Sequence, residues 1–308
     1  MTLLFYILNL INMKLYKTTL LFAFLVLFFL TACKKASNSS ETMVQGTTTI
    51  LVDESILPIV EDQVAVFESK YNAKIKLIPQ SESACINSLT SGKAKIIVLA
   101  RKLSEVERKV FNQSKIKPRE TAFATDGIAL ITKKTTKDSL VELEAIIAFL
   151  NQKPSNVKGL VFDNPNSSTV SYLKNKANLS TMPTKNIYSF ETSNEVIKYV
   201  AENDGMVGVI GINWVMQPSA VTEKYIAKIS ILKVKNSNAQ NYFYPTQDNI
   251  AAADYALARD LYIINCQGGT GLGMGFASFL AGEIGQRIVL KSGLVPITMP
   301  GRKIRIIN

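Results

Sequence analysis

The polar residues that could do chemistry in this chain gather at four points where a predicted strand gives way to a predicted helix. In open α/β sheets, ligands bind beyond the carboxyl ends of the strands, where helices begin. Free N–H groups and the positive end of the helix dipole bind anions there, and hydroxyl groups add further donors. The candidate ligand-binding residues at these junctions are Ser55, Ser81, Ser83, Arg101, Ser167, Ser168 and Thr169.

Each junction also has a plainer interpretation, because Ser, Thr, Asp and Asn before a helix commonly cap its first turn. Arg101 could donate two hydrogen bonds to one oxyanion, or it could be a surface charge. Asp53 and Glu54 would repel a phosphate dianion. They would have to cap their own helix, pair with a cation, or accept a proton from a protonated oxyanion. Binding is favoured if the four junctions converge on one edge of a sheet.

The residue types exclude several kinds of enzyme. The chain contains no His, which removes a Ser-His-Asp triad, a His general base and most zinc chemistry. A serine hydrolase would then need a Lys base. We therefore predict no catalytic residue, no metal and no cofactor. Cys85 and Cys266 could pair in an exported protein, but their different settings favour two separate buried thiols.

A glycine-rich stretch at residues 268–275, Gly-Gly-Thr-Gly-Leu-Gly-Met-Gly, invites interpretation as a phosphate-binding loop. It lacks the Gly-Lys-Ser/Thr ending of a P-loop, and the later acidic strand of a dinucleotide fold does not follow it. We interpret it as a flexible turn that leads into an amphipathic helix over residues 276–291.

Alternating strand and helix patterns predict the α/β fold class, with a body of about 260 residues that is long enough for two lobes. The chain shows no internal repeat of fixed period. Strands are expected at residues 48–52, 74–78, 95–100, 122–132, 159–162, 187–190, 206–212, 227–234 and 258–265. Helices are expected at residues 56–71, 84–89, 139–150, 193–201 and 276–291, and beginning at Ser104 and after Thr169.

The N-terminus has the pattern of an export signal. Residues 1–32 hold no acidic residue, Lys14 and Lys17 precede an apolar run, and the run ends in Leu-Thr-Ala-Cys at residues 30–33. This ending resembles the lipobox of bacterial lipoproteins, so we predict a signal peptide over residues 1–32 and lipidation of Cys33. An uncleaved transmembrane helix is the alternative, but the apolar run is shorter than the roughly 20 residues that a span needs.

Residues 33–46 read as a flexible polar tether. Either Met1 or Met13 could be the true start of the chain. The mature chain, with 33 basic and 24 acidic residues, would carry a net charge of +9, spread along the sequence. Such a surface suits an anionic ligand or a lipid headgroup layer, or is simply solvated. No basic-aromatic motif of a nucleic-acid binder is present.

With its elements in this order, the chain resembles the phosphate-binding proteins of ABC transporters, over roughly residues 47–301. The resemblance is carried by four stretches: ATDGIALI at 124–131, DNPNSSTVSYL at 163–173, VGVIGINW at 207–214, and GFASFLAGEIGQRIVLKSGLVP at 275–296. It implies a two-lobed periplasmic binding protein (type II) fold with a hinge and an interlobe ligand cleft. The lobes would be residues 47–130 with 238–308, and residues 131–237, with crossings near 125–133 and 234–242.

The resemblance also implies where the chain departs from the family. The first anion loop is usually rich in Gly, Ser and Thr, and here it is Asp53-Glu54-Ser55. The third loop usually offers an Asp to hydrogen phosphate, and Arg101 stands there. The fourth loop usually carries an Arg ahead of Ser-Gly-Thr, but here Phe162 and Asp163 occupy that stretch and Ser168 replaces the Gly. Arg101 would then supply the missing positive charge.

The expected function is a membrane-anchored, monomeric solute-binding lipoprotein that captures phosphate or a related small oxyanion for an ABC permease. It would catalyse nothing, and it would lie in the cell envelope on the periplasmic side. The alternative is a sensory or surface lipoprotein of the same fold that binds a non-phosphate ligand or a protein partner. We expect Arg101→Ala to weaken anion binding at least about tenfold, or about 1.4 kcal/mol.

Overall fold

The computed structural model describes residues 41–112, 116–136, 139–237 and 239–301. The predicted signal peptide, the lipidation site Cys33 and the tether as far as residue 40 lie outside these described residues. Within the described ranges, no helix combines the length and apolar character needed to cross a membrane.

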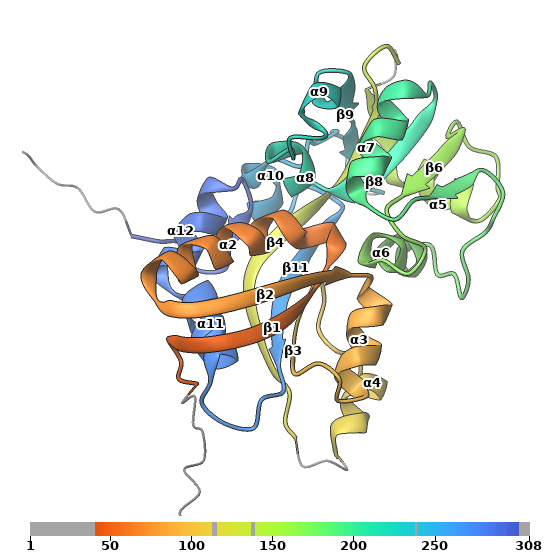
Figure 1. Cartoon of the computed structure of the whole chain (residues 1–308). Coiled ribbons are helices and arrows are strands. Elements are labelled where there is room, and N and C mark those ends of the chain that lie inside the picture. Colours follow the sequence, from red (N-terminus) through yellow and green to blue (C-terminus); the bar gives the residue numbers. More distant parts are fainter. Residues whose placement is uncertain (1–40, 113–115, 137–138, 238, 302–308) are drawn as a thin grey trace, which may run out of the picture. The chain divides into compact units, whose positions relative to one another are not determined.

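The N-terminal part of the body is built from β–α units with parallel strands. β1 pairs with β2 and with β3 in parallel, so the carboxyl ends of these strands point to the same edge of the sheet. Figure 1 shows α2 along one side of these strands and α3 and α4 near β3. The elements are β1 Gln45–Asp53, the 3-10 turn η1 Glu54–Ile56, α2 Leu57–Lys70, β2 Asn72–Gln80, α3 Glu82–Thr90, β3 Ile96–Leu99 and α4 Glu105–Asn112.

One long strand, β4 Arg119–Lys133, connects the two ends of the sheet. Its residues up to Gly127 pair with β11 Ala258–Asn265, and from Ile128 onward it pairs with β8 Met206–Gly211. The described strands of this sheet run in the order β2-β1-β3-β11-β4-β8-β6-β7. The change of partner within β4 marks the place where the chain passes from one end of the sheet to the other.

The second end of the sheet repeats the β–α pattern. β6 lies parallel to both β7 and β8, and α7 packs on β8 and β4. The elements here are β5 Leu140–Glu142, α5 Leu143–Leu150, β6 Gly159–Phe162, α6 Ser168–Lys176, β7 Ile187–Ser189, α7 Ser193–Glu202, α8 Asn213–Met216, α9 Glu223–Ile226, β9 Ile229–Ile231 and β10 Lys233–Lys235. The chain then returns through α10 Gln247–Ala251 to β11, α11 Leu272–Ala281, α12 Glu283–Lys291 and β12 Val295–Pro296.

Apolar side chains of the strands and of the covering helices form the core. Ile50, Val52, Ile96 and Val98 are fully buried among aliphatic and aromatic residues of α2, α11 and α12. The prediction of two separate cysteines is confirmed: Cys85 and Cys266 are free, buried thiols, and both pack in one apolar cluster with Leu99 and Ile264.

Two predicted helices are corrected by the structure. The segment 139–150 begins with a short strand, β5, which pairs with β10, and the helix α5 starts only at Leu143. The segment 276–291 is two helices, because α11 ends at Ala281 and α12 begins at Glu283, with Gly282 between them.

The glycine-rich stretch is also more ordered than the predicted turn, since α11 begins at Leu272. Gly271 offers no side chain to cap this helix, and the Glu41 carboxylate instead accepts the Leu272 N–H at 2.8 Å. A Cβ atom at Gly275 would overlap the carbonyl oxygen of Met43. These glycines therefore admit the segment that leads into β1, and the structure gives them no contact with the site described next.

Candidate anion-binding site

A buried ion pair lies where β4 changes partner. Arg259 stands opposite Asp126 in the β11–β4 register, two residues before Ile128, where β4 begins to pair with β8. Arg259 Nε and Nη2 donate to Asp126 Oδ2 at 3.1 and 3.0 Å. The two side chains are 2% and 1% exposed. A buried guanidinium needs such a partner, because an unpaired charge in the interior is strongly unfavourable.

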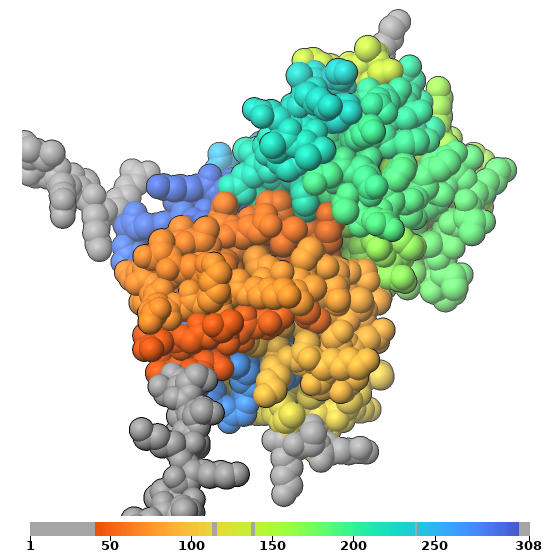
Figure 2. All heavy atoms as spheres, viewed as in Figure 1, coloured from red at the N-terminus to blue at the C-terminus, as the bar shows by residue number. Residues whose placement is uncertain are grey.

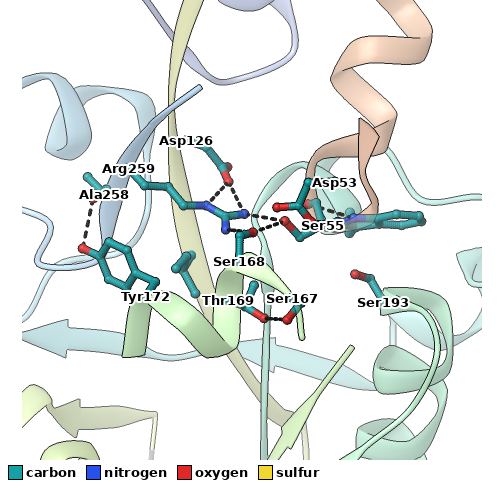
Figure 3. Close-up of polar contacts among 12 residues, drawn as sticks. Asp53, Ser55, Asp126, Ser167, Ser168, Thr169, Tyr172, Ser193, Ala258 and Arg259 are labelled. Atoms are coloured by element: carbon teal, nitrogen blue, oxygen red, sulfur yellow. Dashed lines mark hydrogen bonds and ion pairs between the residues drawn. The ribbon is translucent and has the colours of Figure 1, made fainter. Parts of the chain in front are cut away.

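The remaining donors of Arg259 point to two serine hydroxyls that come from opposite ends of the sheet. Nη1 donates to Ser168 Oγ at 2.7 Å, and Nη2 donates to Ser55 Oγ at 3.1 Å. The two hydroxyls share a hydrogen bond of 2.8 Å. Figure 3 shows the guanidinium between Asp126 on one side and both serines on the other. The first and fourth predicted junctions therefore meet at Arg259.

The fourth junction is the N-terminus of α6. Ser167 is the N-cap, and its Oγ accepts the Val170 N–H at 3.4 Å. Thr169 Oγ1 shares a 2.8 Å hydrogen bond with Ser167 Oγ and donates to Asp163 Oδ1 at 2.7 Å. The fourth junction therefore both caps its own helix and meets the first junction. From the same helix, Tyr172 Oη donates to the Ala258 carbonyl at 3.0 Å, which holds α6 against the start of β11 (Figure 3).

The first junction carries two buried carboxyl groups. Asp53 Oδ1 accepts the Ser55 N–H at 3.2 Å and so caps η1. Burial raises the pKa of Asp53 to about 7, with nearby Glu82 and Asp163 adding to the rise and Arg259 opposing it. Burial and the neighbouring Asp163 raise the pKa of Glu54 to about 8. Both groups therefore hold or share a proton near neutral pH, which reduces their repulsion of an anion.

The short η1 turn also makes direct contacts with the second end of the sheet. Glu54 Oε1 accepts the Ser193 N–H and Glu54 Oε2 accepts the Ser193 hydroxyl, each at 3.0 Å. Trp214 Nε1 donates to the Ser55 carbonyl at 3.1 Å. A Cβ atom at Gly211 would lie 2.5 Å from that same carbonyl, so only glycine allows the approach. In Figure 2 the orange N-terminal surface meets the green surface of the middle of the chain along one boundary.

The second junction contacts the fourth junction through a backbone hydrogen bond. Ser81 is the N-cap of α3, and its Oγ accepts the Ala84 N–H at 3.4 Å. Ser83 is exposed, and its N–H donates to the Asn166 carbonyl at 3.3 Å. The hydroxyl of Ser81 thus serves the cap, and whether either serine contacts a ligand stays a prediction.

The third junction holds Arg101 in a different network. Its Nε donates to Glu82 Oε1 at 3.0 Å, its Nη2 to Glu107 Oε1 at 2.9 Å, and its Nη1 to Glu107 Oε2 and the Lys102 carbonyl. The Arg101 side chain is 33% exposed. A ligand role for Arg101 stays a prediction, and in this structure all three guanidinium nitrogens already donate to protein oxygens.

Three carboxyl oxygens around Arg259 accept no hydrogen bond from the described residues. They are Asp53 Oδ2, Asp126 Oδ1 and Asp163 Oδ2, and their residues are no more than 1% exposed. Burial raises the pKa of Asp126 and of Asp163 as well. Buried polar atoms are normally satisfied, so these oxygens would accept donors from a ligand that carries a proton. The arrangement combines one guanidinium, hydroxyl donors and carboxyl acceptors, and it suits a small protonated oxyanion.

Sequence reasoning missed Arg259, Asp126 and Ser193. One signal could have found the first two, because Asp126 is a charged residue inside an otherwise apolar strand pattern and Arg259 lies at the start of another predicted strand. Opposite charges buried in neighbouring strands must pair, and antiparallel pairing can place them opposite each other. No pattern indicated that Ser193 would meet Glu54, because that contact depends on how the two ends of the sheet close on each other.

Comparison with known proteins agrees with this architecture. The family model for the PBP superfamily domain matches residues 37–283. Among curated proteins, the phosphate-binding protein PstS of Borreliella burgdorferi is 26% identical over 283 residues, covering 86% of this chain and 93% of the relative. The resemblance stated from the sequence is thereby confirmed.

Solved structures support the fold independently. A protein of Clostridium perfringens, described as a phosphate ABC transporter substrate-binding protein and solved with bound phosphate, matches with a TM-score of 0.68 at 21% identity. An ABC-type phosphate transport receptor of Vibrio cholerae matches with a TM-score of 0.61 at 17% identity. Each match covers 82% of this chain and 100% of the other. These likenesses confirm the α/β, two-lobed periplasmic-binding-protein fold.

Proposed function

Because the chain belongs to the PBP superfamily, we propose that it is a solute-binding protein that captures phosphate for an ABC importer. One observation carries the proposal: the buried Arg259 guanidinium donates to the hydroxyls of both Ser55 and Ser168. The phosphate-binding relative and the fold neighbours support the choice of ligand and of transporter class. The protein would bind its solute without transforming it.

The geometry suggests how an oxyanion would be held. Arg259 Nη1 donates to the Ser168 hydroxyl, and Nη2 donates to the Ser55 hydroxyl as well as to Asp126. Anion oxygens can therefore take over the two hydrogen bonds that go to the serines, while the bond to Asp126 stays. Ser55 and Ser168 would then turn their own O–H groups toward the anion. The α6 N-terminus adds the positive end of a helix dipole. Charge-assisted hydrogen bonds of this kind are stronger than neutral ones, particularly in a site from which water is excluded.

The buried carboxyls would select for a ligand that carries a proton. Asp53 and Asp163 each present an unpartnered oxygen, and Arg259 is the single guanidinium that contacts this cluster among the described residues. A hydroxyl of hydrogen phosphate can donate to such an oxygen, whereas sulfate has no proton to donate near neutral pH. An unprotonated sulfate oxygen would be repelled wherever the facing carboxyl is ionised, as Asp53 increasingly is above its pKa of about 7. We therefore expect phosphate to bind more tightly than sulfate.

The proposed lobes are residues 47–130 with 238–308, and residues 131–237. Ser55 and Arg259 belong to the first lobe and Ser168 to the second, so a ligand held by all three would bridge the lobes. The two hydroxyls touch each other in this structure. A phosphate can enter between them only if the lobes part, and hinge closure would then bury it.

Lipidation of Cys33 would tether this body to a membrane and keep captured phosphate near the permease. The lipobox-like sequence at residues 30–33 supports this part of the proposal. The protein would act as a monomer in the cell envelope, on the periplasmic side. Mass spectrometry of the protein from membranes tests the anchor: an unmodified Cys33 would contradict it.

Isothermal titration with phosphate, sulfate and molybdate tests the ligand. We expect phosphate to bind, sulfate to bind more weakly, and Arg259→Lys to abolish most of the phosphate affinity. Arg101→Lys is the matched control, since it changes an arginine of another network in the same way. Absence of binding by all three anions would overturn the oxyanion proposal and favour a non-phosphate ligand or a protein partner.

A further inference from the structure

The Glu54–Ser193 contact joins the two proposed lobes outside the hydroxyl cluster. Glu54 belongs to η1 in the first lobe, and Ser193 is the first residue of α7 in the second. Ser193 is fully buried and Glu54 is 8% exposed. Both oxygens of the carboxyl group are used, since Oε1 accepts the Ser193 N–H and Oε2 accepts the Ser193 hydroxyl, each at 3.0 Å.

The helix does not need Glu54 for its own capping. Thr192 is the N-cap of α7, and Thr192 and Glu195 form a complete capping box. The Ser193 N–H is one of the first-turn donors that a helix leaves without an internal partner. Glu54 therefore meets a donor pair that the second lobe presents at the interface, and the bonds exist only while the lobes are together.

We propose that Glu54 and Ser193 form a latch that holds the two lobes closed and thereby sets the rate at which ligand enters. The proposal rests on the two-lobed solute-binding function proposed above. The latch makes no contact with Arg259, so it acts by positioning the lobes. Because phosphate enters only when the lobes part, a latch that favours the closed form lowers the fraction of protein that can admit ligand.

A double-mutant cycle separates the latch from simple removal of an acidic side chain near the site. The variants are Ser193→Ala, Glu54→Ala and the double variant, with phosphate association measured by stopped flow. We expect Ser193→Ala to speed association at least about threefold in the wild-type background and by less than about 1.5-fold in the Glu54→Ala background. An equal effect in both backgrounds would overturn the latch.

Thr192→Ala is the matched control, because it removes the N-cap of the same helix and leaves the Glu54 contact in place. Small-angle scattering of the ligand-free proteins gives a second readout that needs no phosphate binding. We expect a larger radius of gyration for Ser193→Ala than for wild type and Thr192→Ala. An unchanged radius in Ser193→Ala would overturn the latch, whereas failure to bind phosphate would overturn only the proposed ligand.

Discussion

Arg101 and Arg259 each lie beside a strand–helix junction and each contacts a carboxylate, yet their surroundings differ. Arg101 is one-third exposed, and its three nitrogens donate to Glu82, Glu107 and a backbone carbonyl. Arg259 is buried, pairs with the single carboxylate Asp126, and donates its other two bonds to serine hydroxyls. The first guanidinium is fully engaged by the protein, whereas the second keeps donors that an anion can take over.

The difference teaches that proximity to a junction does not make an arginine a ligand-binding residue. A hydroxyl can rotate and exchange its partner, while a carboxylate that leaves an arginine must find another cation or be solvated. The contacts therefore lower our expectation for Arg101→Ala, from the tenfold loss inferred from sequence to less than about threefold. We propose that Arg259 in β11 supplies the positive charge that the fourth loop lacks.

The largest expected effect comes from Arg259→Lys compared with Arg101→Lys. Lysine keeps the charge opposite Asp126 but loses the planar fork that reaches both serines. We expect the phosphate Kd to rise at least about a hundredfold, or about 3 kcal/mol, for Arg259→Lys. Arg101→Lys is expected to change it less than about threefold. Titration calorimetry measures both Kd values. A larger rise in Kd for Arg101→Lys than for Arg259→Lys would place the anion at Arg101 instead.

The pH dependence of stability is the next largest effect, and Asp53→Asn tests it. Because burial raises the pKa of Asp53 from 3.8 to about 7, wild type loses stability as pH rises between those values. Asn keeps the oxygen that accepts the Ser55 N–H but never ionises. We expect the free energy of unfolding of Asp53→Asn to be about 2 kcal/mol higher than that of wild type at pH 8. At pH 4 the two free energies should be nearly equal.

Urea titrations at several pH values measure this difference. A constant offset between wild type and Asp53→Asn across the whole range would contradict the raised pKa. Asp260→Asn is a suitable control, because Asp260 lies on the same strand as Arg259 but is exposed.

A smaller effect is expected from Ser168→Ala, with Ser81→Ala as its control. Ser168 would lose the hydroxyl that accepts from Arg259 and would donate to the anion, which corresponds to about tenfold in Kd, or about 1.4 kcal/mol. Ser81→Ala removes only a helix cap, so it should lower stability and leave phosphate affinity within about twofold. Equal losses of affinity in the two variants would show that Ser168 matters only for folding.

The smallest expected effect is that of Glu107→Gln, which weakens the network around Arg101. A partly exposed ion pair contributes no more than about 1 kcal/mol, so stability should fall slightly. If Arg101 has only a structural role, loss of the ion pair on its Glu107 side should not change the affinity for phosphate. A tighter Kd in Glu107→Gln would show that the released guanidinium had joined the site.

The helices and strands could be predicted well from the sequence where local residue patterns determine them. β11 was expected at residues 258–265 and occupies those residues, and the α7 helix differs from its prediction only by one residue. The break between α11 and α12 was missed because the apolar periodicity continues across Gly282. Likewise, β5 was read as helix because its pairing with β10 lies more than 90 residues away in the sequence.

The site could be predicted only in part. Ser55, Ser167, Ser168 and Thr169 were named from their places before helices, and the structure brings them together. Ser55 and Ser168 share a charged partner, Arg259, which pairs with Asp126 across 133 residues of sequence. Local patterns carry no information on such a distant pairing. The family-based expectation of an Arg in the fourth loop, which this chain lacks, drew attention to Arg101 in the third loop instead.

A crystal structure of the protein grown with phosphate tests the central claim most directly. We predict a phosphate between Ser55 and Ser168, with its oxygens at hydrogen-bonding distance, about 2.7 to 3.1 Å, from Arg259 Nη1 and Nη2. We further predict that a carboxyl oxygen of Asp53 or Asp163 faces a phosphate oxygen closely enough to share its proton. A phosphate bound instead against Arg101, or a Ser55–Ser168 contact unchanged at saturating phosphate, would contradict the account.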